Sequence, residues 1–172
     1  MKLFLAGSGE LRYSTRAVGS MLACGTVVLT MTLRSSLLRE LVNPNLDVGG
    51  RAELCCKLAK EFEDKGEYEE ACEILSGLWP RIDQRPNVKT LEPDVAAEVL
   101  MRAGVLAGWL GSDQIADAQE QAKNFISESL GIFESRKYKK KIAEAQTELA
   151  LCYMRTGEHE NASDSLSLRS RS

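Results

Sequence analysis

Catalytic and metal-binding side chains are scarce in this chain of 172 residues. It has one histidine, His159, and five cysteines with no Cys-x-x-Cys pair and no histidine at metal-ligand spacing. Acid–base catalysis relies most often on histidine, and zinc sites use Cys and His at short spacings. The glycines at 104, 108 and 111 follow no predicted strand and precede no Lys-Ser/Thr pair, unlike a phosphate loop. We therefore predict that the protein is not an enzyme and has no catalytic residues, metal site or cofactor.

The cysteines also bear on the compartment. Cys55, Cys72 and Cys152 fall among apolar residues on predicted helix faces, where a free cysteine behaves as a small hydrophobe. An odd number of thiols without a pairing pattern fits a reducing compartment. We expect a cytoplasmic protein in which the thiols and His159 are dispensable for activity.

Aromatic residues, prolines and strand-like patterns are sparse as well. Aromatic side chains make up 6% of the chain, which leaves little material for a ligand pocket, whereas 44% hydrophobic residues are enough for one core. All four prolines fall between predicted helices, three of them in the connector 79–94. Residues 51–172 show no alternation of apolar and polar residues. These features predict an all-α domain.

Long hydrophobic runs are limited to residues 17–33, which carry no charge. The run is shorter than the roughly 20 residues that a membrane-spanning helix needs, and Gly, Ser and Thr dilute it. We therefore expect residues 1–50 to be an N-terminal extension, poorly ordered or strand-prone apart from one short helix at 36–43. A membrane or export role for the run is the disfavoured alternative.

Two segments, 52–78 and 143–166, share one pattern of residue types. The matching positions are Leu58 and Leu149, Ala59 and Ala150, Phe62 and Tyr153, Gly66 and Gly157, Tyr68 and His159, and Ala71 and Ala162. Large residues four apart lie on one helical face, and the alanines let a neighbouring helix approach. The glycines end a helix where a left-handed residue is needed. Each segment therefore predicts a helical hairpin, and hairpins of this kind must stack to bury their apolar faces.

A third, degenerate copy lies between these two segments. Leu100, Gly104 and Gly111 have the same spacings as Cys55, Ala59 and Gly66. Residues 114–136 then carry apolar residues three and four apart, which predicts a long second helix. The three copies together predict first helices near 52–65, 95–109 and 140–156.

These copies resemble tetratricopeptide repeats, whose units follow this order of small, large, aromatic and glycine residues. GWLGS followed by AQEQAKNFISES looks like the extended repeats of large bacterial regulatory and scaffold proteins. The resemblance implies a short right-handed α-solenoid of antiparallel helix pairs over 51–168, with a tail at 169–172. It also implies a protein-interaction module or scaffold that binds a protein or peptide in a concave groove.

Two further functions stay open. Apolar periodicity is lost after Leu166, so we expect a fragment of a larger protein of this family. The chain is then a sensor or regulatory segment of a signalling or transcription-control protein. Alternatively, its units associate with those of a second copy.

In tetratricopeptide repeats the first helices build the inner face of the groove. The resemblance therefore assigns the matching positions of this chain, residue by residue, to that face. The partner contacts implied are Glu53, Lys60, Glu98, Met101, Val105, Trp109, Leu151, Met154 and Arg155, and the same faces carry Cys56, Asp64 and Thr147. Trp and Arg are the residue types most often found as interface anchors.

The charge balance disfavours a nucleic-acid partner. Residues 51–172 contain 17 basic and 22 acidic side chains, whereas nucleic-acid-binding domains are normally basic. The basic run 136–141 (RKYKKK) is the exception. It is either a solvated turn that enters the next helix or a contact for an acidic partner or phosphate.

Overall fold

The structure is a computed structural model that describes residues 34–111 and 117–169. The apolar run 17–33, the start of the expected helix 114–136 and the end of the tail lie outside the described residues. Every regular element within them is an α-helix, as the sequence predicted. Residues 34–41 are helical and are followed by α2 (Val48–Glu63), α3 (Tyr68–Leu75), α4 (Pro93–Leu110), α5 (Ala118–Arg136), α6 (Lys139–Arg155) and α7 (His159–Arg169). None of the helices in these ranges is both long and apolar enough to cross a membrane.

Local sequence signals set the helix ends. Asp47 caps α2, where its carboxylate accepts a 2.9 Å hydrogen bond from the Gly50 amide. Gly66 and Gly157 follow α2 and α6 in the left-handed conformation, with φ of 74° and 77°, as the shared pattern predicted. Gly111 ends α4 in the right-handed conformation instead, with φ of −84°. The third glycine of the pattern is therefore required by crowding and not by backbone conformation, since an added Cβ would lie 2.5 Å from the Ala118 Cβ.

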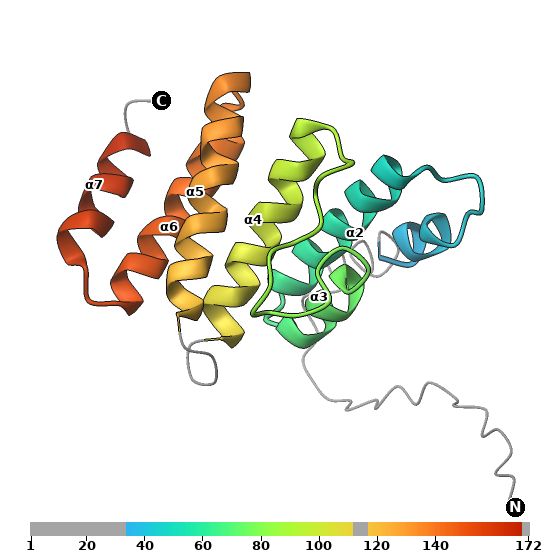
Figure 1. Cartoon of the computed structure of the whole chain (residues 1–172), viewed down its shortest axis with the longest axis horizontal. Helices are drawn as coiled ribbons and strands as arrows, with labels where there is room; N and C mark the ends of the chain where they lie inside the picture. Colours follow the sequence, from blue (N-terminus) through green and yellow to red (C-terminus); the bar gives the residue numbers. More distant parts are fainter. Residues whose placement is uncertain (1–33, 112–116, 170–172) are drawn as a thin grey trace, which may run out of the picture.

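The helices stand side by side in a row, from α7 at one end to α2 and α3 at the other (Figure 1). Short connections join α2 to α3, α5 to α6 and α6 to α7, so these neighbours are antiparallel. The helices α2, α4 and α6 also contact one another in sequence. They overlap the first helices expected at 52–65, 95–109 and 140–156. We call the exposed surface that these three helices share the α2–α4–α6 face.

The central helix α4 contributes most to the core, because α2, α3, α5 and α6 all pack on it. Its fully buried apolar side chains include Val99, Leu100 and Leu106, which belong to one core cluster with Leu75, Ile126 and Phe133 from other helices. Trp79 in the 79–94 connector is 3% exposed, and its indole nitrogen donates to the Gln84 carbonyl oxygen. The connector is therefore attached to the core.

Replacing Gly104 by alanine is expected to destabilise the fold by about 1–2 kcal/mol, because overpacking outweighs the gain in helix propensity. A Cβ at Gly104 would lie 2.6 Å from Ile126 Cγ1 and 3.1 Å from the Ala122 carbonyl oxygen, so α5 must shift. The control is Gly131→Ala in α5, where nothing lies within 4 Å of an added Cβ. That variant should gain about 0.5–1 kcal/mol. Urea denaturation compares the two, and equal effects of both changes would contradict a close crossing of α4 and α5.

Replacing Ala71 by leucine is expected to cost about 1–3 kcal/mol of unfolding free energy. Ala71 lies in α3, has no exposed surface and belongs to the core. Three additional carbon atoms at this position must displace neighbouring helices. The neighbouring, exposed Glu70 provides the control, since Glu70→Leu adds apolar bulk without entering the core. A denaturation midpoint and slope unchanged by Ala71→Leu would show that α3 has room at this crossing.

Candidate functional site

The predicted contact residues separate into an accessible and a buried set. Glu53, Met154, Arg155 and Trp109 are exposed, and Lys60, Glu98 and Leu151 are half-buried. Met101 has no exposed surface and Val105 is only 5% exposed. The Met101 sulfur accepts a hydrogen bond from the Ser129 hydroxyl of α5 at 3.7 Å, so this side chain faces α5. The transfer from the repeat family therefore places these two residues incorrectly, because α2, α3, α5 and α6 all pack on α4.

A cleft of about 520 Å³ lies on the α2–α4–α6 face, toward the end where α4 and α6 begin. Its buried lining consists of Cys56, Val95, Arg102 and Phe133. Leu37 lines it on one side, and Tyr138 and Lys141 line it from the start of α6. The remaining lining residues are the charged side chains Glu53, Lys57, Lys60, Glu61, Asp94 and Glu98. The cleft thus combines an apolar floor with a rim of both charges.

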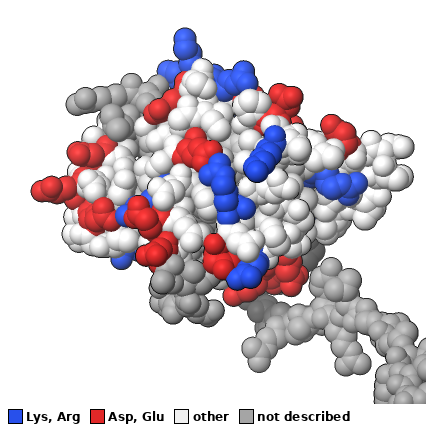
Figure 2. All heavy atoms as spheres, viewed as in Figure 1, with Lys and Arg blue, Asp and Glu red and all other residues white. Residues whose placement is uncertain are grey.

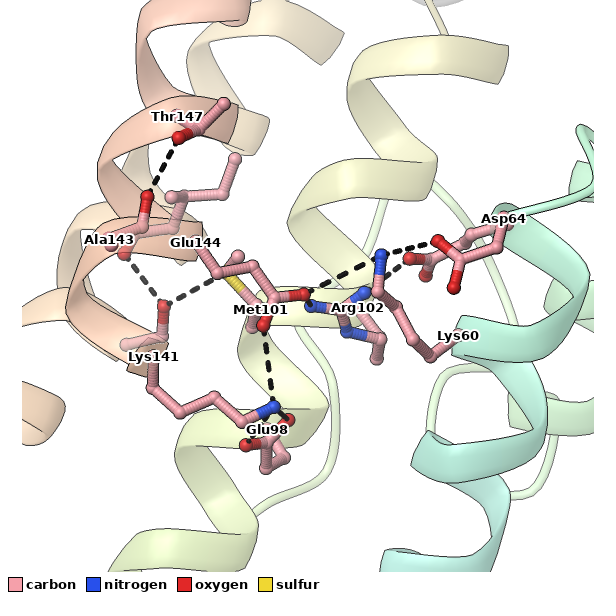
Figure 3. Close-up of polar contacts among 12 residues, drawn as sticks. Lys60, Asp64, Glu98, Met101, Arg102, Lys141, Ala143, Glu144 and Thr147 are labelled. Carbon is pink, nitrogen blue, oxygen red and sulfur yellow. Dashed lines mark hydrogen bonds and ion pairs between the residues drawn. The ribbon is translucent and has the colours of Figure 1, made fainter. Parts of the chain in front are cut away.

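A buried guanidinium joins the three helices beneath this face. Arg102 of α4 is 1% exposed, and its Nη1 donates to Glu63 Oε2 of α2. Its Nη2 donates to Glu144 Oε1 of α6 at 2.6 Å (Figure 3). A buried charge is tolerated only when it is paired and hydrogen-bonded. Arg102 therefore ties α2 and α6 to α4.

Two lysines extend this arrangement toward solvent. Lys60 Nζ lies 2.7 Å from Asp64 Oδ1 and 3.7 Å from Glu144 Oε1. Lys141 Nζ lies 2.8 Å from Glu98 Oε1 and 3.4 Å from Glu144 Oε2. Figure 3 shows these side chains pointing toward one another from α2, α4 and α6. Glu98 and Lys60, two of the predicted contacts, thus form ion pairs within the fold.

Burial and charge act in opposite directions on the carboxylates around Arg102. Burial raises the pKa of Glu63 to about 7, although Arg102 and Lys60 oppose the shift. Burial also acts on Glu144, but Arg102 and Lys141 together hold the pKa of that carboxyl below its usual range. Among the described atoms, Glu63 Oε1 and Arg102 Nε are buried without a hydrogen-bond partner. The fold therefore disfavours the ionised form of Glu63, whereas it favours the ionised form of Glu144.

Sequence reasoning missed this arrangement, although one signal for it exists. Arg102 is the only charged residue between Glu98 and Asp113. A single charge inside an apolar helical stretch indicates a buried pair, because an unpaired charge there would be very costly. The identity of its partners depends on how three helices pack, and spacing within one helix does not contain that information.

An aromatic cluster lies at the opposite end of the face, where the three helices end. The Trp109 ring stacks on Tyr68, with centroids 5.0 Å apart and an interplanar angle of 14°. The Arg155 guanidinium carbon lies 4.1 Å from the Trp109 ring centroid. Trp109 is still 43% exposed, and the neighbouring Met154 is 52% exposed. The structure thus brings together two of the predicted contacts, Trp109 and Arg155, and adds Tyr68. His159, which matches Tyr68 in the repeated pattern, is exposed and does not pack in the same way.

The basic run 136–141 is partly used inside the fold. Arg136 Nε lies 3.0 Å from Asp94 Oδ1, and the Tyr138 hydroxyl donates to Asp94 Oδ2 at 2.8 Å. Lys141 pairs with Glu98, whereas Lys137, Lys139 and Lys140 are exposed. Acidic and basic side chains are interspersed over the side of the molecule seen in Figure 2, without a large region of one sign. The run is therefore chiefly a structured turn between α5 and α6.

Comparison with protein-family models, with curated proteins and with solved structures finds no match to this chain.

Proposed function

We propose that this chain is a protein-interaction module in which a partner segment lies along the α2–α4–α6 face. The proposed architecture is a short right-handed solenoid of tetratricopeptide-like helix pairs. The order of the helices supports it, since each pair packs on the next and the first helices contact one another. Stacked pairs of this kind form extended surfaces for binding.

One observation carries the proposal: an accessible cleft and an exposed Trp–Arg cluster lie at the two ends of one face. Trp109 and Arg155 are of the types that dominate interface energetics, and the exposed Met154, which precedes Arg155 in α6, is an adaptable apolar side chain. The cleft offers an apolar floor of Cys56, Val95 and Phe133. An extended or helical segment along the face reaches both ends.

The proposal is tested by mapping the footprint of a captured partner. The full chain serves as bait, and the partner recovered is then purified and added to the chain at saturation. Hydrogen exchange should slow in the exposed parts of α2, α4 and α6 and stay unchanged in α7. Protection confined to residues 136–141 or to α7 would place the contact elsewhere and overturn the proposal.

The alternative is self-association, in which a second copy would stack on a terminal helix. The helix α7, at one end of the row, gives this alternative less support. The exposed residues of α7 are mostly polar: Glu160, Asn161, Ser163, Asp164 and Ser167. Among the α7 side chains that the structure describes, Leu166, at 43% exposure, is the large apolar exception. A stacking surface between copies requires a contiguous apolar face, which these residues of α7 do not provide.

A further inference from the structure

The helical residues 34–41 are drawn in blue in Figure 1, and Leu37 of this helix lines the cleft. Three side chains of this helix, Arg34, Leu37 and Leu41, are turned toward the body of the protein and are half-buried. They are separated by three and four residues, so they lie on one helical face. This is the pattern by which an amphipathic helix docks into a groove.

The contacts of this helix run along α2. The Arg34 guanidinium lies 3.7 Å from the centroid of the Phe62 ring and pairs with Glu67 at 3.1 Å. At the other end, Arg51 donates to the Leu41 carbonyl oxygen at 2.8 Å. Arg34 is thus placed near the end of α2 and Leu41 near its beginning. The helix therefore lies antiparallel to α2.

The attachment is slight compared with that of the other helices. None of the residues 34–51 is buried, and the apolar core begins at Ala52. The ion pair between Arg34 and Glu67 is exposed to solvent, with 29% and 39% of the side chains accessible, and exposed ion pairs contribute little. Leu41 packs against the core, but no buried core residue belongs to this helix, so we expect the core of α2 to α7 to persist without it. Removing the helix uncovers Phe62 and opens the cleft beside Leu37.

We propose that the helix 34–41 is a detachable internal occupant of the α2 surface beside the cleft, and that the partner segment replacing it is an amphipathic helix. That helix carries a cation and two aliphatic side chains at the spacing of Arg34, Leu37 and Leu41. The inference rests on the proposed function, because it names the class of partner for the same face. The internal helix and the partner then compete for one site. The apparent affinity for the partner equals the intrinsic affinity multiplied by the fraction of time that the site is free of the internal helix.

The test uses the full chain and a synthetic peptide of residues 34–45, acetylated and amidated, as the probe. The variant Leu37→Asp/Leu41→Asp detaches the internal helix by placing two charges against α2. Titration of the isotope-labelled chain with the peptide, followed by NMR, should show saturable shifts in α2 of this variant. We expect apparent binding at least about tenfold tighter than to the wild-type chain, whose site is already occupied.

Two matched controls define the expected result. Leu38→Asp alters the same helix at a side chain that is 36% exposed, so this chain should respond to the peptide as wild type does. A peptide with aspartate at both positions 37 and 41 should not bind the detached variant. The proposal is overturned if the double variant binds the peptide no better than wild type, or if Leu38→Asp opens the site equally.

Native-state hydrogen exchange of the wild-type chain gives an independent readout that needs no variant. Amides of residues 37–41 should exchange at least about tenfold faster than those of α4, because a separate small unit opens without global unfolding. Equal protection of the two helices would overturn the proposal. Failure of the wider proposed function would look different: the peptide would bind the detached variant, yet partner footprints would lie away from the α2–α4–α6 face.

Discussion

Replacing Arg102 by methionine is expected to destabilise the fold by about 3–5 kcal/mol, the cost of breaking a buried ion pair from one side. Methionine fills a similar volume but cannot donate hydrogen bonds. Glu63 and Glu144, which Arg102 joins, would then lie near each other as buried or half-buried carboxylates without their shared cation. Urea denaturation at neutral pH measures the loss.

The control for this change is Arg85→Met. Arg85 makes the same kind of two-point contact, with its Nη1 and Nη2 donating to Glu128 at 2.8 and 2.6 Å. Both side chains of that pair are exposed, at 54% and 43%. An exposed pair is worth roughly 0–1 kcal/mol, so the loss should be small. If the two variants lose equal stability, burial of Arg102 does not determine the effect.

The Arg102→Met penalty should also depend on pH. Burial already raises the pKa of Glu63 to about 7 in the folded chain, above its usual value of 4.5. A carboxyl with a raised pKa binds its proton more tightly in the folded state, so its contribution is fully present below pH 4.5 and is lost as the pH rises toward 7. Without Arg102 this pKa rises further, because the opposing charge is gone.

The penalty is therefore expected to be smaller at pH 4.5 than at pH 8. Adding Glu63→Gln to Arg102→Met should recover part of the lost stability at pH 8 and little at pH 4.5, since glutamine cannot ionise. Denaturation curves of both variants at the two pH values decide this. A penalty of Arg102→Met that is constant with pH would mean that Glu63 remains solvated when its partner is removed.

The sequence predicted the helices well because their signals are local. The apolar spacing and glycines around α2 and α6 are read within one hairpin, and Gly66 and Gly157 have the expected backbone conformation. The faces of α4 were harder to predict, because its exposure depends on which helices cover it. Val105 illustrates this, since it is only 5% exposed, whereas Lys60, the matching position on α2, is half-buried.

The candidate site was likewise predictable only in part. Trp109, Met154 and Arg155 were found from their positions on the first helices. The structure brings Trp109 and Arg155 together and leaves Met154 exposed near the end of α6. The stacking of Tyr68 on Trp109 joins α3 to α4 across 41 positions of sequence. The docking of helix 34–41 against α2 likewise arises from tertiary packing. The residue pattern within a single helix predicts neither the stacking of Tyr68 on Trp109 nor the docking of helix 34–41.

Trp109→Ala is expected to weaken binding of a groove partner by about 2–4 kcal/mol, or roughly 30-fold and more. The ring offers exposed aromatic surface between the stacked Tyr68 and the guanidinium of Arg155. Its removal takes away the largest accessible side chain at this end of the face and releases Arg155. Calorimetric titration of the purified partner measures the effect.

The same substitution also removes the stacking and cation–π contacts, worth roughly 1–2 kcal/mol of stability together, so affinity and thermal midpoint must both be measured. Trp109→Phe separates the two effects, since phenylalanine retains an aromatic ring against Tyr68 while losing part of the contact surface. Its stability should lie close to wild type, with an intermediate affinity. If the partner binds a folded Trp109→Ala chain as tightly as wild type but loses affinity on Lys139→Ala/Lys140→Ala, these exposed lysines are the contact. The aromatic end of the α2–α4–α6 face then serves only to hold α3, α4 and α6 together.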